Sequence, residues 1–259
     1  MASRHSAFYS PLLATLGRGF DATYSVLQAG QRSQDLIREG VVDIMQSAVS
    51  SNWQPMERGE GPLPVHFALI NRRDGFFIAA PEGADEAFEW KKLQGRTLLA
   101  DRGGQPLAML KYAVAFNGVD WNKIYIVDQG DAYYIHRQAP GPWRPVASVG
   151  ASVPEVAFST LCCAREFIGT PAYEDFVAAY NASRDWVRTA APEDVAVVES
   201  SFFPAVSVND LADAIEAYQK LGTWSGSTEI TEALYDQSLN VFEHSGGITS
   251  RHPRSAVCL

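Results

Sequence analysis

Residues 96–118 read RTLLADRGGQPLAMLKYAVAFNG and contain a complete strand–loop–helix unit. The apolar run 96–100 predicts a buried strand, and DRGGQ predicts a tight loop after it. Pro106 suits the first turn of a helix, because its missing N–H would be unpaired there anyway, and Gly118 suits the position after the helix end. With another strand expected at 124–127, the segment predicts a βαβ unit.

Strands and helices alternate at short intervals on both sides of this unit. We expect further strands at 7–9, 22–27, 41–45, 66–70, 75–80 and 132–135, and helices at 12–16 and 31–38. From Phe158 onward the pattern becomes helical, at 160–168, 173–189, 192–200, 208–221 and 228–243. The chain is therefore predicted to be an α/β protein with a mainly parallel sheet and a helix-rich C-terminal third.

One connection conflicts with this reading. About five residues separate the strands expected at 124–127 and 132–135, whereas parallel neighbours need a crossover of about a dozen residues or more. Either these strands are not parallel neighbours, or the chain lacks a helix at this point.

Composition excludes several classes of protein. The 259 residues suffice for two lobes, and 46% hydrophobic with 20% charged residues is typical of a globular protein. The net charge of −9 argues against a nucleic-acid partner, which would require a basic face. No apolar run reaches the roughly 18 residues of a membrane span, and the N-terminal stretch is no secretory signal. We expect a periplasmic protein if a leader peptide has been removed, and a cytoplasmic one if Met1 is the native start.

The cysteines give no sign of a disulfide framework or a metal site. There are three, Cys162, Cys163 and Cys258, and an odd number cannot be fully paired within the chain. Cys162 and Cys163 lie side by side in an apolar run, which favours two small core residues. No His or Cys follows them at ligand spacing, so we expect neither a metal nor another cofactor.

Six segments resemble, in order, the substrate-binding proteins of nitrate-, sulfonate- and taurine-type ABC transporters. Within that group the chain is most similar to the branch related to thiamine-pyrimidine precursor synthases and binding proteins. The segments are YSPLLATLGRGF (9–20), LIREGVVDIMQSA (36–48), GFFIAAPE (75–82), WKKLQGRTLLADRGGQP (90–106), DAYYIHRQAP (131–140) and VAFSTLCCAREF (156–167).

The resemblance implies a two-lobed, type II periplasmic-binding-protein-like fold with a ligand cleft between the lobes. Residues 1–78 and 157–259 would form the first lobe and residues 79–156 the second. The hinge crossovers would lie near 77–81 and 152–158. The chain departs from the family pattern after the first helix, where several residues are missing, and before DAYYIH, where a whole helix is missing.

In open α/β sheets ligands bind at the carboxyl ends of the strands, and this rule selects four loops. The first holds Tyr9 and Ser10, which could stack on and hydrogen-bond a ligand, or form an ordinary helix start with Tyr9 in the core. The second holds Gln46 and Ser47, either as ligand-binding polar groups after a buried strand or as a simple loop.

The third loop is Arg102, Gly103, Gly104 and Gln105, before the Pro106 helix. Two glycines allow close backbone approach, and a helix N-terminus presents free N–H groups and a positive dipole to an anion. The alternative is a plain strand-to-helix turn. The spacing does not fit a dinucleotide fingerprint, since a third glycine and a downstream acidic residue are missing at the required positions.

The resemblance adds the fourth loop and two further positions. It places a strand end in the cleft that carries Asp131, Tyr133, His136 and Gln138. His136 could be a general base, although a lone histidine is more often structural. Phe76 could stack on a planar ligand or pack in the core, and Ser159 lies where the chain would cross back to the first lobe.

The favoured function is a solute-binding protein that captures a small organic ligand, anionic or aromatic and heterocyclic, and delivers it to an ABC permease. We expect it to be a monomer. The alternative is an enzyme on the same scaffold, such as a desulfinase, a decarboxylase or a pyrimidine-synthase-like protein. A desulfinase would carry a cysteine where this chain has Tyr9 and Ser10, and Cys162–Cys163 matches the synthase poorly. A ligand-sensing module ranks last, because no DNA-binding segment is attached.

Overall fold

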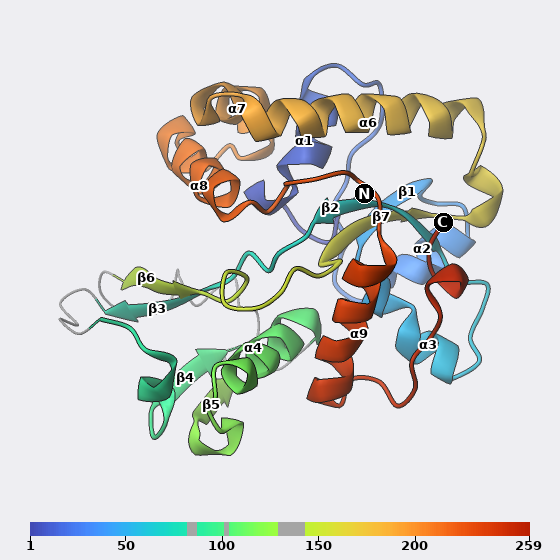
Figure 1. Cartoon of the computed structure of the whole chain (residues 1–259). Coiled ribbons are helices and arrows are strands. Elements are labelled where there is room, and N and C mark those ends of the chain that lie inside the picture. Colours follow the sequence, from blue (N-terminus) through green and yellow to red (C-terminus); the bar gives the residue numbers. More distant parts are fainter. Residues whose placement is uncertain (82–86, 101–103, 129–142) are drawn as a thin grey trace.

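The computed structural model describes residues 1–81, 87–100, 104–128 and 143–259. The chain forms two lobes of mixed α/β structure (Figure 1). The core of the first lobe is a three-stranded sheet in the order β1-β7-β2, built from β1 (Ile44–Ser47), β7 (Ser159–Cys163) and β2 (Val65–Asn71). Central β7 is antiparallel to both neighbours, and all five of its residues are buried.

Helices cover both faces of this sheet (Figure 1). One layer contains α1 (Ser10–Gly17), α6 (Pro171–Thr189), α7 (Pro192–Glu199) and α8 (Val208–Leu221). The other contains α2 (Ser33–Arg38), α3 (Trp53–Glu57) and α9 (Glu232–Ser245). Buried aromatic side chains anchor both layers: Trp224 packs among α7 and α8, while Trp53 and Tyr235 pack edge to face with ring centroids 5.8 Å apart.

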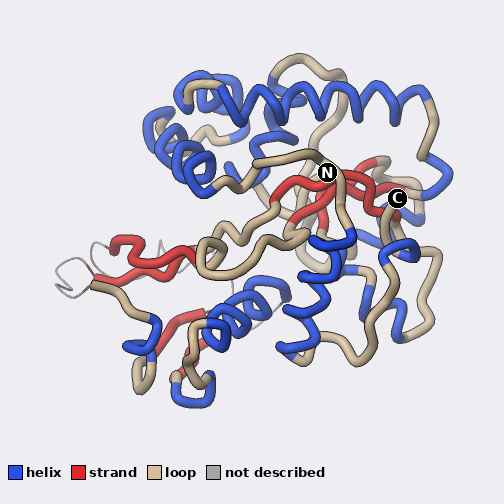
Figure 2. The backbone as a smooth tube through the Cα atoms, in the orientation of Figure 1, coloured by secondary structure: helices blue, strands red, loops and turns tan. Residues whose placement is uncertain are grey.

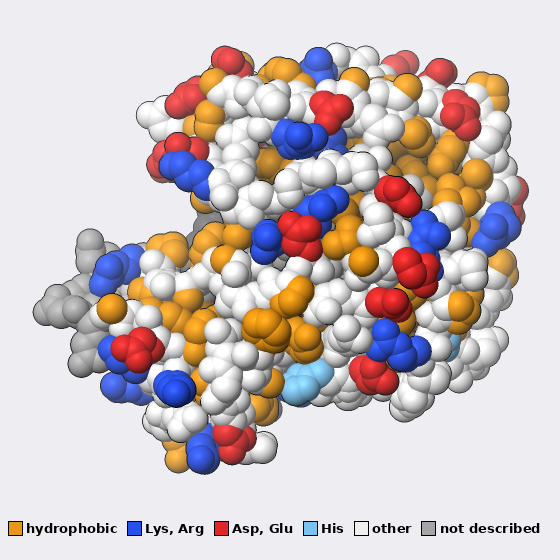
Figure 3. Space-filling model, in the orientation of Figure 1, with side chains coloured by type: hydrophobic (Ala, Val, Ile, Leu, Met, Phe, Trp, Pro, Cys, Tyr) orange, Lys and Arg blue, Asp and Glu red, His pale blue; other side chains and the backbone are white. Residues whose placement is uncertain are grey.

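The second lobe contains two separate strand pairs (Figure 2). Strand β3 (Phe77–Pro81) pairs antiparallel with β6 (Trp143–Ser148), and β4 (Thr97–Ala100) pairs parallel with β5 (Tyr125–Asp128). Helix α4 (Gly104–Phe116) connects β4 to β5 and also packs against α9 of the first lobe. Between the lobes the surface is deeply indented, and hydrophobic side chains border the indentation (Figure 3).

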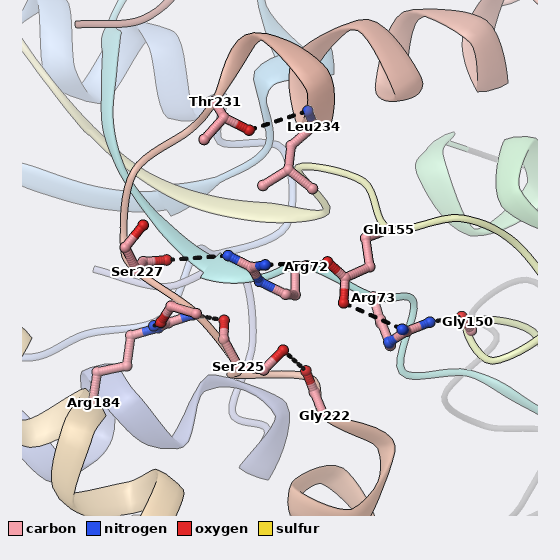
Figure 4. A network of polar contacts seen from close by, with 11 residues as sticks. Arg72, Arg73, Gly150, Glu155, Arg184, Gly222, Ser225, Ser227, Thr231 and Leu234 are labelled. Atoms are coloured by element: carbon pink, nitrogen blue, oxygen red, sulfur yellow. Dashed lines mark hydrogen bonds and ion pairs between the residues drawn. The ribbon is translucent and has the colours of Figure 1, made fainter.

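Two chain segments cross between the lobes and are bonded to each other. Residues 72–76 run outward and residues 149–158 return, with backbone bonds from Val149 N to Phe76 O at 3.0 Å and from Val156 N to Arg72 O at 2.9 Å. Glu155 accepts hydrogen bonds from Arg72 at 3.1 Å and from Arg73 at 3.2 Å (Figure 4). The lobes are therefore joined by a bonded pair of segments.

The βαβ prediction for residues 96–127 is confirmed, and so are most helices after residue 170. Three predicted elements are wrong. Residues 7–9 form a 3-10 helix, residues 22–27 contain one isolated bridge at Val26, and the helix expected at 160–168 is instead strand β7 and a 3-10 turn. The sheet is not mainly parallel in the described residues, because β7 runs against both neighbours. The strand expected at 132–135 lies outside the described residues.

The error at β7 has a physical cause. Strand β7 is covered on both faces, so its side chains show neither a period of two nor a period of 3.6. A short continuous apolar run of this kind cannot be assigned to strand or helix by periodicity alone.

Candidate functional site

A cavity of about 530 Å³ lies between the first lobe and the start of α4. Its described walls come from the N-terminal segment, the end of β1, helices α2 and α3, and the first residues of α4, with α9 on one side. The residues are Ser3, Leu27, Arg32, Ser33, Gln34, Met45, Gln46, Ser47, Ala48, Ser50, Ser51, Gln54, Pro55, Arg58, Gly104, Gln105, Phe242 and Gly247. Predicted site residues Gln46, Ser47, Gly104 and Gln105 are thus brought together.

Gln46 is a buried polar residue of this wall, with only 4% of its surface exposed. Its Oε1 accepts two hydrogen bonds from Ser3, from the backbone N–H at 3.0 Å and from the hydroxyl at 2.6 Å. Its Nε2 donates to the carbonyl oxygen of Ser47 at 3.2 Å. Hydrogen bonds therefore hold both the oxygen and the nitrogen of the carboxamide in place.

Tyr9 is linked to the Gln46 carboxamide indirectly, through the hydroxyl of Ser3. It is buried and is not among the lining residues, but its hydroxyl lies 3.3 Å from Ser3 Oγ. The Ser3 hydroxyl carries one hydrogen, and Gln46 takes it, so Tyr9 is the donor in this contact. The two hydroxyls form a chain that ends on the Gln46 oxygen, and such chains polarise each other.

Serine hydroxyls donate hydrogen bonds to the side-chain oxygens of two further glutamines in the wall. Ser33 donates to Gln34 Oε1 at 3.2 Å, and Ser50 donates across to Gln105 Oε1 of α4 at 3.4 Å. An amide group has one acceptor oxygen and two donor hydrogens. Each of these oxygens accepts one bond, and Gln34 Nε2 also donates to the carbonyl oxygen of Ser51 at 2.9 Å. Both glutamines keep N–H hydrogens that a ligand could use.

The charged groups of the wall are two arginines. Arg32 and Arg58 both pair with Glu60, and about half of each arginine side chain is exposed, at 51% and 53%. The hydrogen bond with Glu60 raises the pKa of Arg32, so its charge is permanent. The N-terminus of α4 adds the positive end of a helix dipole. The described lining includes no Asp, Glu, His, Lys or Cys, although Glu60 beside it partly balances the two arginine charges.

Besides Tyr9, three predicted ligand residues lie outside the cavity. Ser10 is fully buried, and its hydroxyl oxygen lies 2.7 Å from the carbonyl oxygen of Ala7 and 2.9 Å from Glu199 Oε2. Burial raises the pKa of Glu199 well above its usual range. Phe76 packs near Phe158 on the crossing segments, with ring centroids 6.4 Å apart.

Ser159 is the third, a buried first residue of β7 opposite Asn71. Arg102, Gly103, Asp131, Tyr133, His136 and Gln138 lie outside the described residues. Gly104 has a φ of +61°, a conformation that L side chains rarely adopt. A bulky substitution at Gly104 would therefore strain the backbone as well as block a ligand.

Among the lining residues, the sequence did not predict Ser3, Arg32, Gln34 and Ser50. The polar run QSAVSSN, which follows the expected strand 41–45, was a usable signal for Ser50. No local sequence signal indicated Ser3, because its partner Gln46 lies 43 residues away and only the folded chain brings the two together.

No family model matches the chain. It is 22% identical, over 96% of its length and 83% of the relative, to YtlA of Bacillus subtilis (strain 168), which is named as a binding protein. Among solved structures it is similar to the periplasmic aliphatic sulphonate binding protein SsuA from Escherichia coli, with a TM-score of 0.68, 13% identity, and coverage of 96% of this chain and 88% of that one.

Two other solved structures share the fold. The alkanesulfonate-binding protein SsuA from Xanthomonas axonopodis pv. citri, bound to MOPS, gives a TM-score of 0.67 at 12% identity, covering 98% of this chain and 95% of that one. The ligand-binding component of an ABC-type import system from Staphylococcus aureus gives 0.65 at 11% identity, covering 98% and 93%. These likenesses establish that the chain has the fold of periplasmic binding proteins of ABC import systems.

Proposed function

We propose that this protein is a solute-binding protein that captures a small organic anion between its lobes and delivers it to an ABC permease. The observation that carries the proposal is the chemistry of the cavity. Its described walls offer amide and hydroxyl groups, two arginines and a helix N-terminus. A cavity of about 530 Å³ also falls within the range of small-molecule sites.

The same walls support binding better than catalysis. Acid–base and nucleophilic catalysis need a titratable group within hydrogen-bond reach of the ligand. The serines of the described lining have no histidine or carboxylate beside them in the cavity. An enzyme on this scaffold is therefore the less supported reading, and a role in import places the protein outside the cytoplasmic membrane.

The donor-rich wall and the similar structures support one ligand class over others. Two of the similar structures are sulfonate-binding proteins, one of them bound to MOPS. A sulfonate presents three acceptor oxygens and one negative charge, which suits amide donors beside arginines. We propose a sulfonate or another small oxyanion as the ligand of this chain, with aromatic acids and pyrimidines as the competing classes.

A ligand panel tests the proposal. A ligand present at about 100 times its dissociation constant should stabilise the fold by roughly 2.7 kcal/mol. We expect thermal shifts with methanesulfonate, taurine or MOPS that exceed those with matched chloride salts, followed by saturable heats in calorimetry. Native mass spectrometry of the purified protein would reveal a co-purifying ligand. A panel of sulfonates, aromatic acids and pyrimidines that gives no shift at millimolar concentration would contradict the proposal.

A further inference from the structure

Both hydrogen bonds that the side-chain oxygen of Gln46 accepts come from one residue, Ser3. Ser3 donates both its backbone N–H and its hydroxyl to Oε1, at 3.0 and 2.6 Å. A carbonyl oxygen has two lone pairs, and these two bonds use both. A ligand in the cavity therefore has no free acceptor on Gln46.

The nitrogen of the same carboxamide still has a hydrogen to offer. Nε2 carries two hydrogens, and one is donated to the carbonyl oxygen of Ser47 at 3.2 Å. In the part of the chain that the structure describes, the second has no acceptor, and Gln46 lines the cavity. A ligand that meets Gln46 meets a donor.

Rotating the carboxamide by 180° would reverse this polarity, and Ser3 opposes the rotation. The nitrogen would then face the Ser3 backbone N–H at about the 3.0 Å now spanned by a hydrogen bond. A backbone N–H can only donate, so two donors would oppose each other at a buried position, which is costly. The Tyr9 hydroxyl supports the present arrangement, because it satisfies Ser3 Oγ as an acceptor.

We propose that Ser3 is a positioning residue that sets the hydrogen-bond polarity of the cavity wall by holding Gln46 as a donor. The inference rests on the proposed function, since it assigns to the same cavity a preference for acceptor atoms. Ser3 acts through Gln46, and Tyr9 acts through Ser3.

The first test needs no ligand. In uniformly ¹⁵N-labelled protein, the Gln46 side-chain amide signals are assigned by their loss in Gln46→Met. We expect no strong nuclear Overhauser effect between these protons and the Ser3 amide proton, because the oxygen faces Ser3. A strong effect would show the opposite orientation and overturn the inference, whatever the protein binds.

The second test measures affinity with MOPS and methanesulfonate as probes. Ser3→Ala removes the hydroxyl and should weaken binding about fivefold, whereas Ser3→Thr keeps it and should stay within about twofold of wild type. Gln46→Glu keeps the shape but presents an acceptor in place of the donor, and should weaken binding at least about a hundredfold. Ser200→Ala, which removes a hydroxyl–carbonyl bond in another part of the fold, is the matched control.

The outcomes separate the two claims. Equal affinities of wild type and Gln46→Glu, or equal losses in Ser3→Ala and Ser3→Thr at unchanged thermal midpoints, would overturn the inference. If neither probe binds the wild-type protein, the sulfonate proposal fails, and the ligand-free spectrum still decides the orientation of Gln46.

Discussion

At the scale of single residues, Asp74 is a carboxylic acid that the fold keeps neutral. It lies on the outgoing crossing segment and is fully buried. Its Oδ1 accepts a hydrogen bond from the Phe76 N–H at 2.6 Å, while Oδ2 has no partner among the described residues. Burial raises the pKa of Asp74 to about 8, against the lowering effect of the Phe76 bond. The side chain therefore keeps its proton at neutral pH.

This carboxyl predicts a pH-dependent stability. Between its ordinary pKa of 3.8 and about 8 the folded state holds a proton that the unfolded chain has lost, so stability falls as pH rises through this range. Asp74→Asn keeps the acceptor and removes the titration. We expect the variant to match wild type near pH 5 and to exceed it by a few kcal/mol near pH 9, since each pKa unit is worth about 1.4 kcal/mol.

Urea denaturation at pH 5, 7 and 9 checks this expectation. Asp236→Asn, at an exposed position, serves as the control, because its pH profile should follow that of wild type. The same pH slope in Asp74→Asn and wild type would show that Asp74 is already ionised in the folded protein.

Residue-scale features also show where sequence reasoning succeeds. Gln46 and Ser47 were selected because polar side chains were expected to follow a strand at 41–45. They are instead the last two residues of β1, and the structure places both at the cavity. Ser10 was selected by the same rule applied to residues 7–9, but those residues form a 3-10 helix, and Ser10 is bonded to buried Glu199. The rule holds only where the strand itself exists.

At the scale of elements, the predictable parts carry local signals. Helix α4 contains Pro106 in its first turn and is followed by Gly118 with a φ of +72°, as the sequence indicates. The direction of β7 has no local signal, because it depends on the return of the chain from the second lobe. The contact of α4 with α9 is equally invisible in sequence, although it helps to close the cavity.

The turn after β6 shows how tightly the crossing segments approach. A Cβ added at Gly150 would lie 2.1 Å from the backbone oxygen of Asp74, and backbone cannot move away cheaply. We expect Gly150→Ala to lower the free energy of unfolding by about 2 kcal/mol or more, measured by urea denaturation, because overpacking a fixed site typically costs 1–3 kcal/mol.

Ala151→Ser tests the same turn at an exposed position and should change stability by less than about 0.5 kcal/mol. Equal, small effects of the two variants would mean that the crossing segments separate easily at this point.

At the scale of the whole molecule, the lobe boundaries remain our proposal: residues 1–78 and 157–259 against residues 79–156. The two bonded crossing segments support this division but put its first boundary a few residues earlier, before β3 (Phe77–Pro81). In the described residues, the chain passes between the strand pairs of the second lobe and the sheet of the first only at these segments. Ligand binding between the lobes would then bend these segments. Their stiffness sets the free-energy difference between open and closed forms, and thus the apparent affinity.

Glu155 is the side chain that most directly joins the two segments. One oxygen pairs with Arg72 and the other with Arg73, while Arg73 also donates to the carbonyl oxygen of Gly150 at 3.1 Å (Figure 4). Arg72 extends the link to the carbonyl oxygen of Ser227 at 3.4 Å. The three charged side chains are 16–32% exposed, so solvent screens the pairs only in part.

Glu155→Gln removes the charge and should loosen the crossing without unfolding either lobe. We expect a loss of about 1 kcal/mol in local stability, seen as severalfold faster hydrogen exchange in peptides covering 72–76 and 149–158, because charge-assisted bonds exceed neutral ones. Glu243→Gln breaks an exposed pair with Arg251 and should leave exchange at the crossing unchanged. Hydrogen exchange at the wild-type rate in both variants would contradict this prediction. The backbone hydrogen bonds between the two crossing segments would then hold the lobes together without Glu155.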